Sequence, residues 1–147
     1  MRVLLITLFS FLIVLKPHNE LSLDRSTRLP KIDLSAVVDR LKAIESNYTI
    51  DTVGDDGRAL GVLQIHKCVI DDVNRVFLTS YTHEDVLNEC KAEQVFYYYM
   101  RITKRVIKNN EGRLPTEEDY VRSWNGGAYN GWKEISTKKY WDKYNSL

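Results

Sequence analysis

Three short segments of this chain carry polar side chains suited to chemistry on a sugar. Glu45 stands at the end of a short amphipathic segment. Gln64 lies in residues 61–65, Gly-Val-Leu-Gln-Ile, and Asn125 follows Trp124 and precedes two glycines. A carboxylic acid can protonate the leaving oxygen of a glycosidic bond, and amides can hold sugar hydroxyl or acetamido groups. Together the three segments predict a site for glycosidic-bond cleavage.

The segment before Glu45 predicts a helix that would raise the pKa of this carboxyl group. Asp33 or Ser35 can cap the helix, and its end is expected near Ser46. Glu45 then lies in the last turn, where the helix dipole disfavours a negative charge, and it borders the apolar face, where burial acts in the same direction. An ordinary surface glutamate is the alternative. The apolar positions of the helix are Val37, Val38, Leu41 and Ile44.

The other two segments also have simpler structural interpretations. Residues 61–65 fit a buried strand, and Asn125 with two glycines fits a helix end. Trp124 fits a core position, although its flat apolar face also suits a pyranose ring. The order and spacing of the three segments favour the sugar site.

The elements that must position these residues are mostly helical. Residues 47–65 contain strand formers around the turn Gly-Asp-Asp-Gly at 54–57, which predicts a small β-hairpin. Thr82 with Asp85 predicts the start of a long central helix that reaches about Lys108. Its inner face is expected to carry Ala92, Val95, Phe96, Tyr99, Ile102 and Val106. A short helix follows Thr116, and a last amphipathic segment spans residues 133–144, so the fold class is predicted to be α+β, predominantly helical.

The three segments together resemble the motifs of a known family. Glu45-Ser46-Asn47, followed by Gly-x-Leu-Gln-Ile, resembles the E-S…G-x-M-Q-I signature of soluble lytic transglycosylases and goose-type lysozymes. Residues 124–127, Trp-Asn-Gly-Gly, are similar to the family's aromatic-Asn-x-Gly motif, with Trp where Tyr is usual. Leu63 replaces the usual Met, which is close in volume. The resemblance spans roughly residues 33–144 and implies a lysozyme-like fold with a β-hairpin beside the cleft.

The resemblance implies a role for each matching residue. Glu45 would be the catalytic acid/base that cleaves the MurNAc-GlcNAc β-1,4 bond of peptidoglycan. Gln64 would contact backbone or sugar, and Asn125 would bind the acetamido or neighbouring hydroxyl groups. Trp124 and Tyr129 are further expected substrate contacts; residues 128–131, Ala-Tyr-Asn-Gly, also match the aromatic-Asn pattern, and Asn125 is preferred because it ends a predicted helix. No cofactor or metal is expected.

The fate of the cleaved bond depends on whether Glu45 has a partner. In a lytic transglycosylase one glutamic acid suffices, because the substrate's N-acetyl group assists and the muramyl 6-hydroxyl closes a 1,6-anhydro ring. An inverting hydrolase activates water with a second carboxylate about 6.5–9.5 Å away. Asp55 and Asp56 are the candidates for that carboxylate, although simple turn chemistry also explains them. Transglycosylation is the first expectation, and hydrolysis is the alternative.

The N-terminus predicts export. Met1-Arg2 precedes a largely apolar run over residues 3–15, which fits a secretory signal and is shorter than the about 20 residues of a membrane span. No clear cleavage site follows, so residues 1–16 are expected to be either a signal peptide or an uncleaved anchor. Residues 17–32 are expected to be a linker, and residues 33–147 the catalytic domain. The expected location is the periplasm, the cell envelope or the extracellular space.

Cys68 and Cys90 are the only cysteines. In an exported chain they predict one disulfide, worth roughly 3 kcal/mol in the chain-entropy model. A metal site that adds His66 and His83 is the weaker alternative, because neither spacing matches a common zinc pattern. Two buried free thiols are the further alternative if the chain never meets an oxidising compartment.

Composition limits the remaining classes. With 147 residues and 44% hydrophobic content, one domain and a monomer are expected. No basic stripe with interleaved aromatics and no phosphate-binding glycine loop occurs, so nucleic-acid and nucleotide binding are not predicted. The expected partner is the peptidoglycan glycan strand. Two other classes remain open: a non-catalytic glycan-binding relative, and a membrane-attached lysis or secretion accessory.

Overall fold

The computed structural model of the protein describes residues 31–147, of which Ile32–Leu147 form one compact unit. The predicted export segment, residues 1–16, and most of the predicted linker, residues 17–32, lie outside the described residues. Within residues 31–147, no helix is long and apolar enough to cross a membrane.

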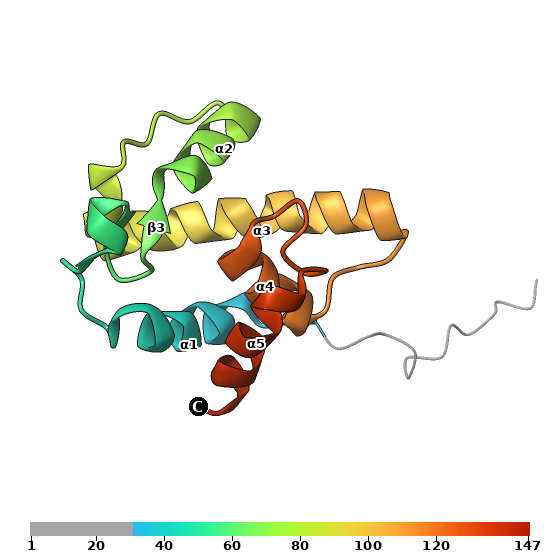
Figure 1. Ribbon diagram of the computed structural model, residues 1–147. Helices are drawn as coiled ribbons and strands as arrows, with labels where there is room; N and C mark the ends of the chain where they lie inside the picture. The colour runs from blue at the N-terminus through green and yellow to red at the C-terminus, as the bar shows by residue number, and fades with distance from the viewer. Residues whose placement is uncertain (1–30) are drawn as a thin grey trace, which may run out of the picture. The chain divides into compact units, whose positions relative to one another are not determined.

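The described chain is predominantly helical with one small antiparallel sheet, which confirms the predicted α+β class (Figure 1). Short 3-10 turns connect several of the elements. The helices are α1 (Leu34–Ser46), α2 (Lys67–Phe77), α3 (Glu89–Glu111), α4 (Glu117–Gly126) and α5 (Lys138–Asn145); the strands are β1 (Val53–Gly54), β2 (Ala59–Leu60) and β3 (Ile65–His66); the 3-10 turns are η2 (Asp55–Gly57), η3 (Glu84–Leu87) and η4 (Ile135–Thr137).

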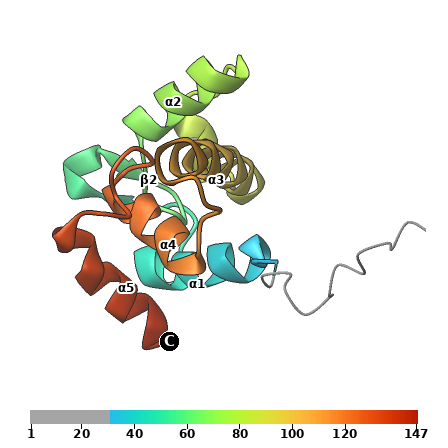
Figure 2. The same ribbon diagram turned by 90° about the vertical axis from the view of Figure 1, so that its right-hand side faces the viewer.

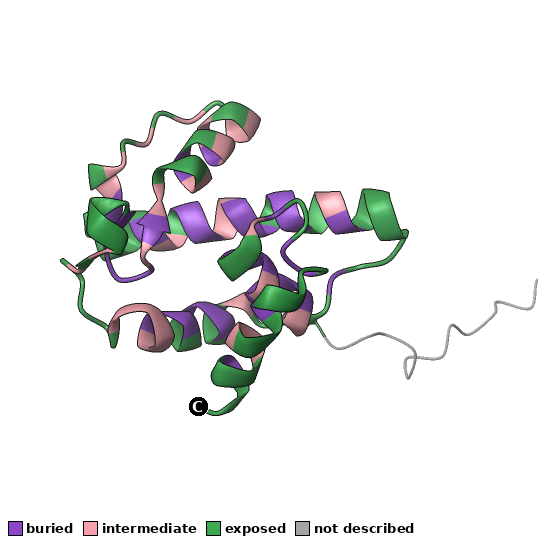
Figure 3. Ribbon diagram, viewed as in Figure 1, coloured by how far each residue is buried: buried purple, intermediate pink, exposed green. Residues whose placement is uncertain are grey.

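The long helix α3 lies at the centre of the unit. Helix α2 packs along one side of it, and α1 and α4 pack along the other, with α5 against α1 and α4 (Figures 1 and 2). A buried stripe runs along α3 (Figure 3) and follows the predicted inner face. Val106, which was expected on that face, is only half-buried. The buried members of the stripe include Ala92, Val95, Phe96, Tyr99 and Ile102.

Helix α1 begins and ends where its sequence predicts. The Asp33 side chain caps it by accepting a hydrogen bond from the backbone N–H of Ser35 at 3.0 Å. Asn47 ends it in the left-handed region with φ 50°. Glu45 therefore lies in the last turn of the helix, as expected.

The β element contains one more strand than the predicted hairpin. Strand β2 pairs with β1 through Val53 and Leu60 and with β3 through Ala59 and His66. Residues 48–50 belong to the stretch that was predicted to contain strand formers, but they form no strand. Tyr48 has φ 63°, so the chain reverses directly after α1 and leaves this segment without a strand partner.

The long helix begins later than predicted. The carboxylate of Asp85 accepts from the backbone N–H of Thr82 at 2.9 Å, but this pair closes only the short turn η3. Asn88 then adopts an extended conformation and caps α3, which runs past Lys108. The predicted cap at Thr116 is confirmed, because Thr116 and Asp119 form a reciprocal capping box at the start of α4.

Candidate functional site

Residues from four parts of the chain meet around a pocket of about 260 Å³. Glu45 enters from the end of α1, and Trp124 and Asn125 enter from the end of α4. The β element and the start of α2 supply the opposite wall. The complete lining is Glu45, Asp55, Ala59, Gln64, Ile65, His66, Val69, Trp124 and Asn125. The pocket thus brings together the three segments that the sequence singled out.

Glu45 is held by a tyrosine that lies far along the chain. The hydroxyl of Tyr140, in α5, donates to Glu45 Oε1 at 2.5 Å. Burial raises the pKa of Glu45 above its ordinary value of 4.5. The Tyr140 hydrogen bond, the positive charge of Lys143 and the Trp124 side chain act in the opposite direction and are outweighed. Glu45 is therefore a partly buried acid that holds its proton more tightly than an exposed glutamate does.

Tyr140 is a site residue that the sequence did not identify. It stands at helical spacing with Tyr144 and resembles one more apolar position of the last segment. In the structure it is half-buried, and burial followed by the negative charge of Glu45 raises the pKa of its own hydroxyl. The phenol therefore stays protonated and serves as a donor. No local pattern could reveal this contact, because its partner lies ninety-five residues away.

Ser46 joins the helix that carries Glu45 to the segment that carries Gln64. Its hydroxyl donates to the backbone carbonyl of Val62 at 2.8 Å. Val62 and Leu63 are fully buried beside it. This bond explains why a serine next to the glutamate matters for the geometry: it fixes the β element against the end of α1.

The amide nitrogen of Gln64 donates its hydrogen bonds within the β element. Nε2 donates to the carbonyls of Gly61 at 2.8 Å and Thr52 at 3.1 Å. Its Oε1 lies so close to Gly54 that a Cβ placed there would be 2.1 Å from it. Gln64 lines the pocket, and its hydrogen bonds show a backbone-contacting role.

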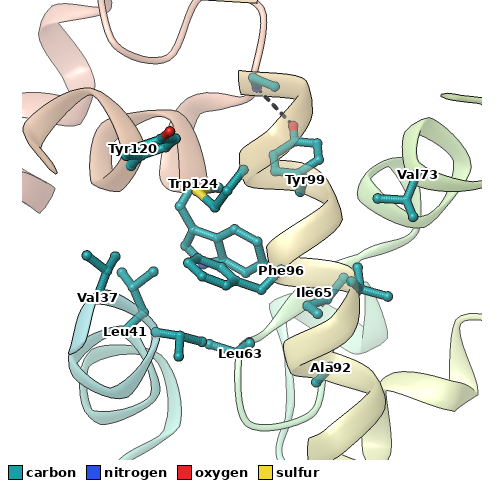
Figure 4. Packing of buried hydrophobic residues seen from close by; sticks show 14 of the residues in the cluster. Val37, Leu41, Leu63, Ile65, Val73, Ala92, Phe96, Tyr99, Tyr120 and Trp124 are labelled. Carbon is teal, nitrogen blue, oxygen red and sulfur yellow. Dashed lines mark hydrogen bonds between the residues drawn. The ribbon is translucent and has the colours of Figure 1, made fainter. Parts of the chain in front are cut away.

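The two residues from α4 contribute unequally. Trp124 is only 9% exposed, and its ring packs edge-to-face against Phe96 and Tyr99 in the core (Figure 4). Little of its flat face is open to a sugar ring. Asn125 is exposed in the last turn of the helix and lines the pocket. Tyr129 is not among the lining residues; it is 44% exposed, and its hydroxyl accepts from Arg75 at 2.9 Å.

The structure separates the two aspartates that the sequence treated alike. Asp55 lines the pocket, whereas Asp56 is exposed and does not. Asp55 accepts from Arg58 at 2.7 Å, and its second oxygen lies 3.5 Å from Nε2 of His66, another lining residue. A carboxylate and an imidazole thus share the pocket with Glu45.

The expected disulfide is not formed. Cys68 in α2 and Cys90 in α3 are free and exposed. The two helices pack against each other, and their buried residues include Ile70, Val73 and Val95 but neither cysteine. In residues 31–147 no group of three or more histidine, cysteine, aspartate or glutamate side chains could hold a metal ion.

Comparisons with protein-family models, with curated proteins and with solved structures found no match for this chain.

Proposed function

We propose that the protein cleaves peptidoglycan at the β-1,4 bond between N-acetylmuramic acid and N-acetylglucosamine, with Glu45 as general acid/base. The observation that carries the proposal is a partly buried carboxyl group, with a raised pKa, at the wall of a pocket that also holds an amide and a second carboxylate. The lysozyme-like fold and export through residues 1–16 belong to the same proposal.

The Tyr140 hydrogen bond supports different roles for the two oxygens of Glu45. Because Oε1 already accepts from Tyr140, the acidic proton belongs on Oε2. That oxygen donates its proton to the leaving oxygen as the glycosidic bond breaks. The negative charge left on Glu45 is stabilised by the Tyr140 hydroxyl and by Lys143, which lies close enough to lower the pKa.

Lytic transglycosylation is the first candidate for the second step. The carbonyl oxygen of the substrate's N-acetyl group bonds to C1 as the protonated leaving oxygen departs, and the Glu45 carboxylate then removes the proton from the muramyl 6-hydroxyl. The 6-oxygen bonds to C1, the bond from C1 to the acetamido oxygen breaks, and a 1,6-anhydro end results. Glu45 recovers its proton, so the cycle needs no second carboxylate.

Hydrolysis is the second candidate, and the position of Asp55 favours it. Asp55 lies in the Glu45 pocket and Asp56 does not, so Asp55 is the residue that could position water. Mass spectrometry of the released muropeptides separates the two candidates. Anhydro ends support transglycosylation, whereas reducing ends that disappear in Asp55→Asn support hydrolysis.

Zymography on purified cell walls tests the proposal as a whole. The wild-type protein is expected to clear the substrate, and Glu45→Gln is expected to lose at least about 100-fold of the activity, as for removal of a general acid. Asp56→Asn, an exposed acid-to-amide change outside the pocket lining, is the matched control and should clear normally. Equal clearing by wild type and Glu45→Gln would overturn the assignment; binding to cell walls without clearing by either would indicate a non-catalytic glycan-binding relative.

A further inference from the structure

A second group of aromatic and polar residues lies on α3, and the proposed reaction does not use it. Gln94, Tyr97, Tyr98 and Arg101 line a surface pocket of about 260 Å³. None of them lines the pocket of Glu45. They stand at positions i, i+3, i+4 and i+7 of one helix, so they share one face. We call them the α3 aromatic face.

The guanidinium group of Arg101 is fixed by aromatic rings. It lies 4.7 Å from the ring centroid of Phe77 in α2 and 5.7 Å from that of Tyr98. The two rings are themselves in contact, with centroids 4.7 Å apart. Stacking on two rings holds the planar guanidinium in place and reduces the entropy that a ligand's binding would cost.

The same guanidinium has no acidic partner among the residues that the structure describes. Within residues 31–147 no carboxylate forms an ion pair with Arg101, and no acidic residue lines its pocket. Its side chain is exposed, so its N–H donors face water. A positioned, unpaired arginine is suited to two parallel hydrogen bonds with a carboxylate.

The other end of the face offers an oriented amide. The hydroxyl of Tyr81 donates to Gln94 Oε1 at 2.9 Å, which leaves the Nε2 donors of Gln94 for another acceptor. Gln94 and Arg101 are seven residues apart in α3, or about 10 Å along the axis. An extended peptide covers that span with about three residues.

We propose that the α3 aromatic face binds the free carboxylate end of a short extended peptide, with Arg101 on the carboxylate, Gln94 on a peptide carbonyl and the rings of Tyr97 and Tyr98 beneath the side chains. The identification of that peptide as the stem peptide of peptidoglycan rests on the proposed function. The site would hold the wall polymer at a place separate from the pocket that cleaves its glycan strand.

The test measures peptide binding without any cleavage, in the full chain carrying Glu45→Gln. The probes are a synthetic stem tetrapeptide with a free carboxyl terminus and the same peptide with a terminal carboxamide. The free acid is expected to shift the ring resonances of Tyr97 and Tyr98 in NMR titrations. Its affinity is expected to be at least about tenfold higher than that of the carboxamide, as a charge-assisted bidentate contact implies.

Substitutions on α3 assign the contact. Arg101→Gln should weaken binding of the free acid at least about tenfold. Arg105→Gln, an exposed arginine one turn further along α3, removes the same charge and should change affinity less than about twofold. Equal binding of acid and amide, or equal loss in both variants, would overturn the proposal.

The outcome is independent of catalysis. Cell-wall cleavage by the wild-type protein with no peptide binding would reject this inference and leave the proposed function standing. Peptide binding at Arg101 without any cleavage by the wild-type protein would reject the proposed function and leave the peptide site standing.

Discussion

At the scale of single residues, the proposed chemistry depends on two opposing influences on the pKa of Glu45, burial and hydrogen bonding. Burial raises the pKa of this carboxyl group, whereas Tyr140 and Lys143 favour its charged form. A general acid needs both influences: it must hold its proton before the bond breaks and tolerate the charge afterwards. The sequence predicted the raised pKa from the helix end and the apolar face, and the structure assigns it to burial first.

Replacing Glu45 should stabilise the protein at neutral pH. The folded pKa of Glu45 lies above 4.5, so the folded state binds this proton more tightly than the unfolded state does. The wild-type free energy of unfolding therefore decreases as pH rises from 4.5 through the folded pKa. Glu45→Gln, which does not titrate, should be more stable than wild type at pH 7 in urea unfolding. Below pH 4 the difference in unfolding free energy between the two proteins should no longer change with pH. A difference that is the same at every pH would contradict the raised pKa.

Removing the Tyr140 hydroxyl should change the pH profile of the proposed cleavage reaction. In Tyr140→Phe the carboxylate loses its hydrogen bond, so the pKa of Glu45 should rise further. The limb of the pH–activity curve that reports the acid should move to higher pH, and kcat should fall about tenfold because the charged form is less stabilised. Tyr144→Phe is the matched control, since its hydroxyl bonds Glu117 and not Glu45. An unshifted limb in Tyr140→Phe would show that Tyr140 does not set the acidity.

At the scale of elements, local signals decided where α1 and α4 begin. Asp33 caps α1, and the capping box of Thr116 and Asp119 opens α4, because a cap involves residues only two or three positions apart. The signal at Thr82 and Asp85 was equally local and opened only a 3-10 turn. Packing of Val86, which is fully buried, and the extended Asn88 decided that outcome, and neither is visible in the capping pattern.

The capping box of α4 yields a stability prediction. Burial alone would raise the pKa of Asp119, but its bonds to Arg113 and Thr116 outweigh burial and hold the pKa below 3.8. The charged form therefore stabilises the fold above pH 3.8, and this contribution is lost as pH falls through the folded pKa. Asp119→Asn should cost about 2 kcal/mol in urea unfolding at pH 7 and less at pH 3. Glu134→Gln, an exposed acid at the surface, should cost less than about 0.5 kcal/mol; an equal cost for the two variants at pH 7 would contradict the role of the cap.

At the scale of the whole molecule, α1 is attached to the central helix through a buried lysine. Lys42 is 4% exposed, and its ammonium group bonds Glu89 at 2.7 Å and also bonds Glu93. Burial by itself lowers the pKa of Lys42, but the bonds and charges of the two glutamates outweigh it and raise the pKa. The amine therefore stays charged, and the cluster fixes the helix that carries Glu45 against α3.

Breaking this cluster should cost more than breaking a surface ion pair. Lys42→Met leaves two neighbouring carboxylates without their partner, and because both are partly exposed we expect a cost of about 1–3 kcal/mol. Lys67→Met breaks an exposed pair with Asp71 within α2 and should cost less than about 0.5 kcal/mol. Chemical denaturation of both variants provides the comparison. Adding Glu93→Gln to Lys42→Met should recover part of the loss, and failure to recover any would exclude carboxylate repulsion as its cause.

The sequence by itself determined the helical character, the end of α1 near Glu45 and the caps of two helices, because these depend on residues within one or two turns of one another. It also selected Gln64 and Asn125, which share a pocket with Glu45. Only the tertiary structure decided that Tyr140 holds the carboxyl group, that Asp55 and not Asp56 lines the pocket, and that the two cysteines are free and exposed. Those outcomes depend on contacts between distant segments, whose geometry is set by packing around α3 and carries no local signal.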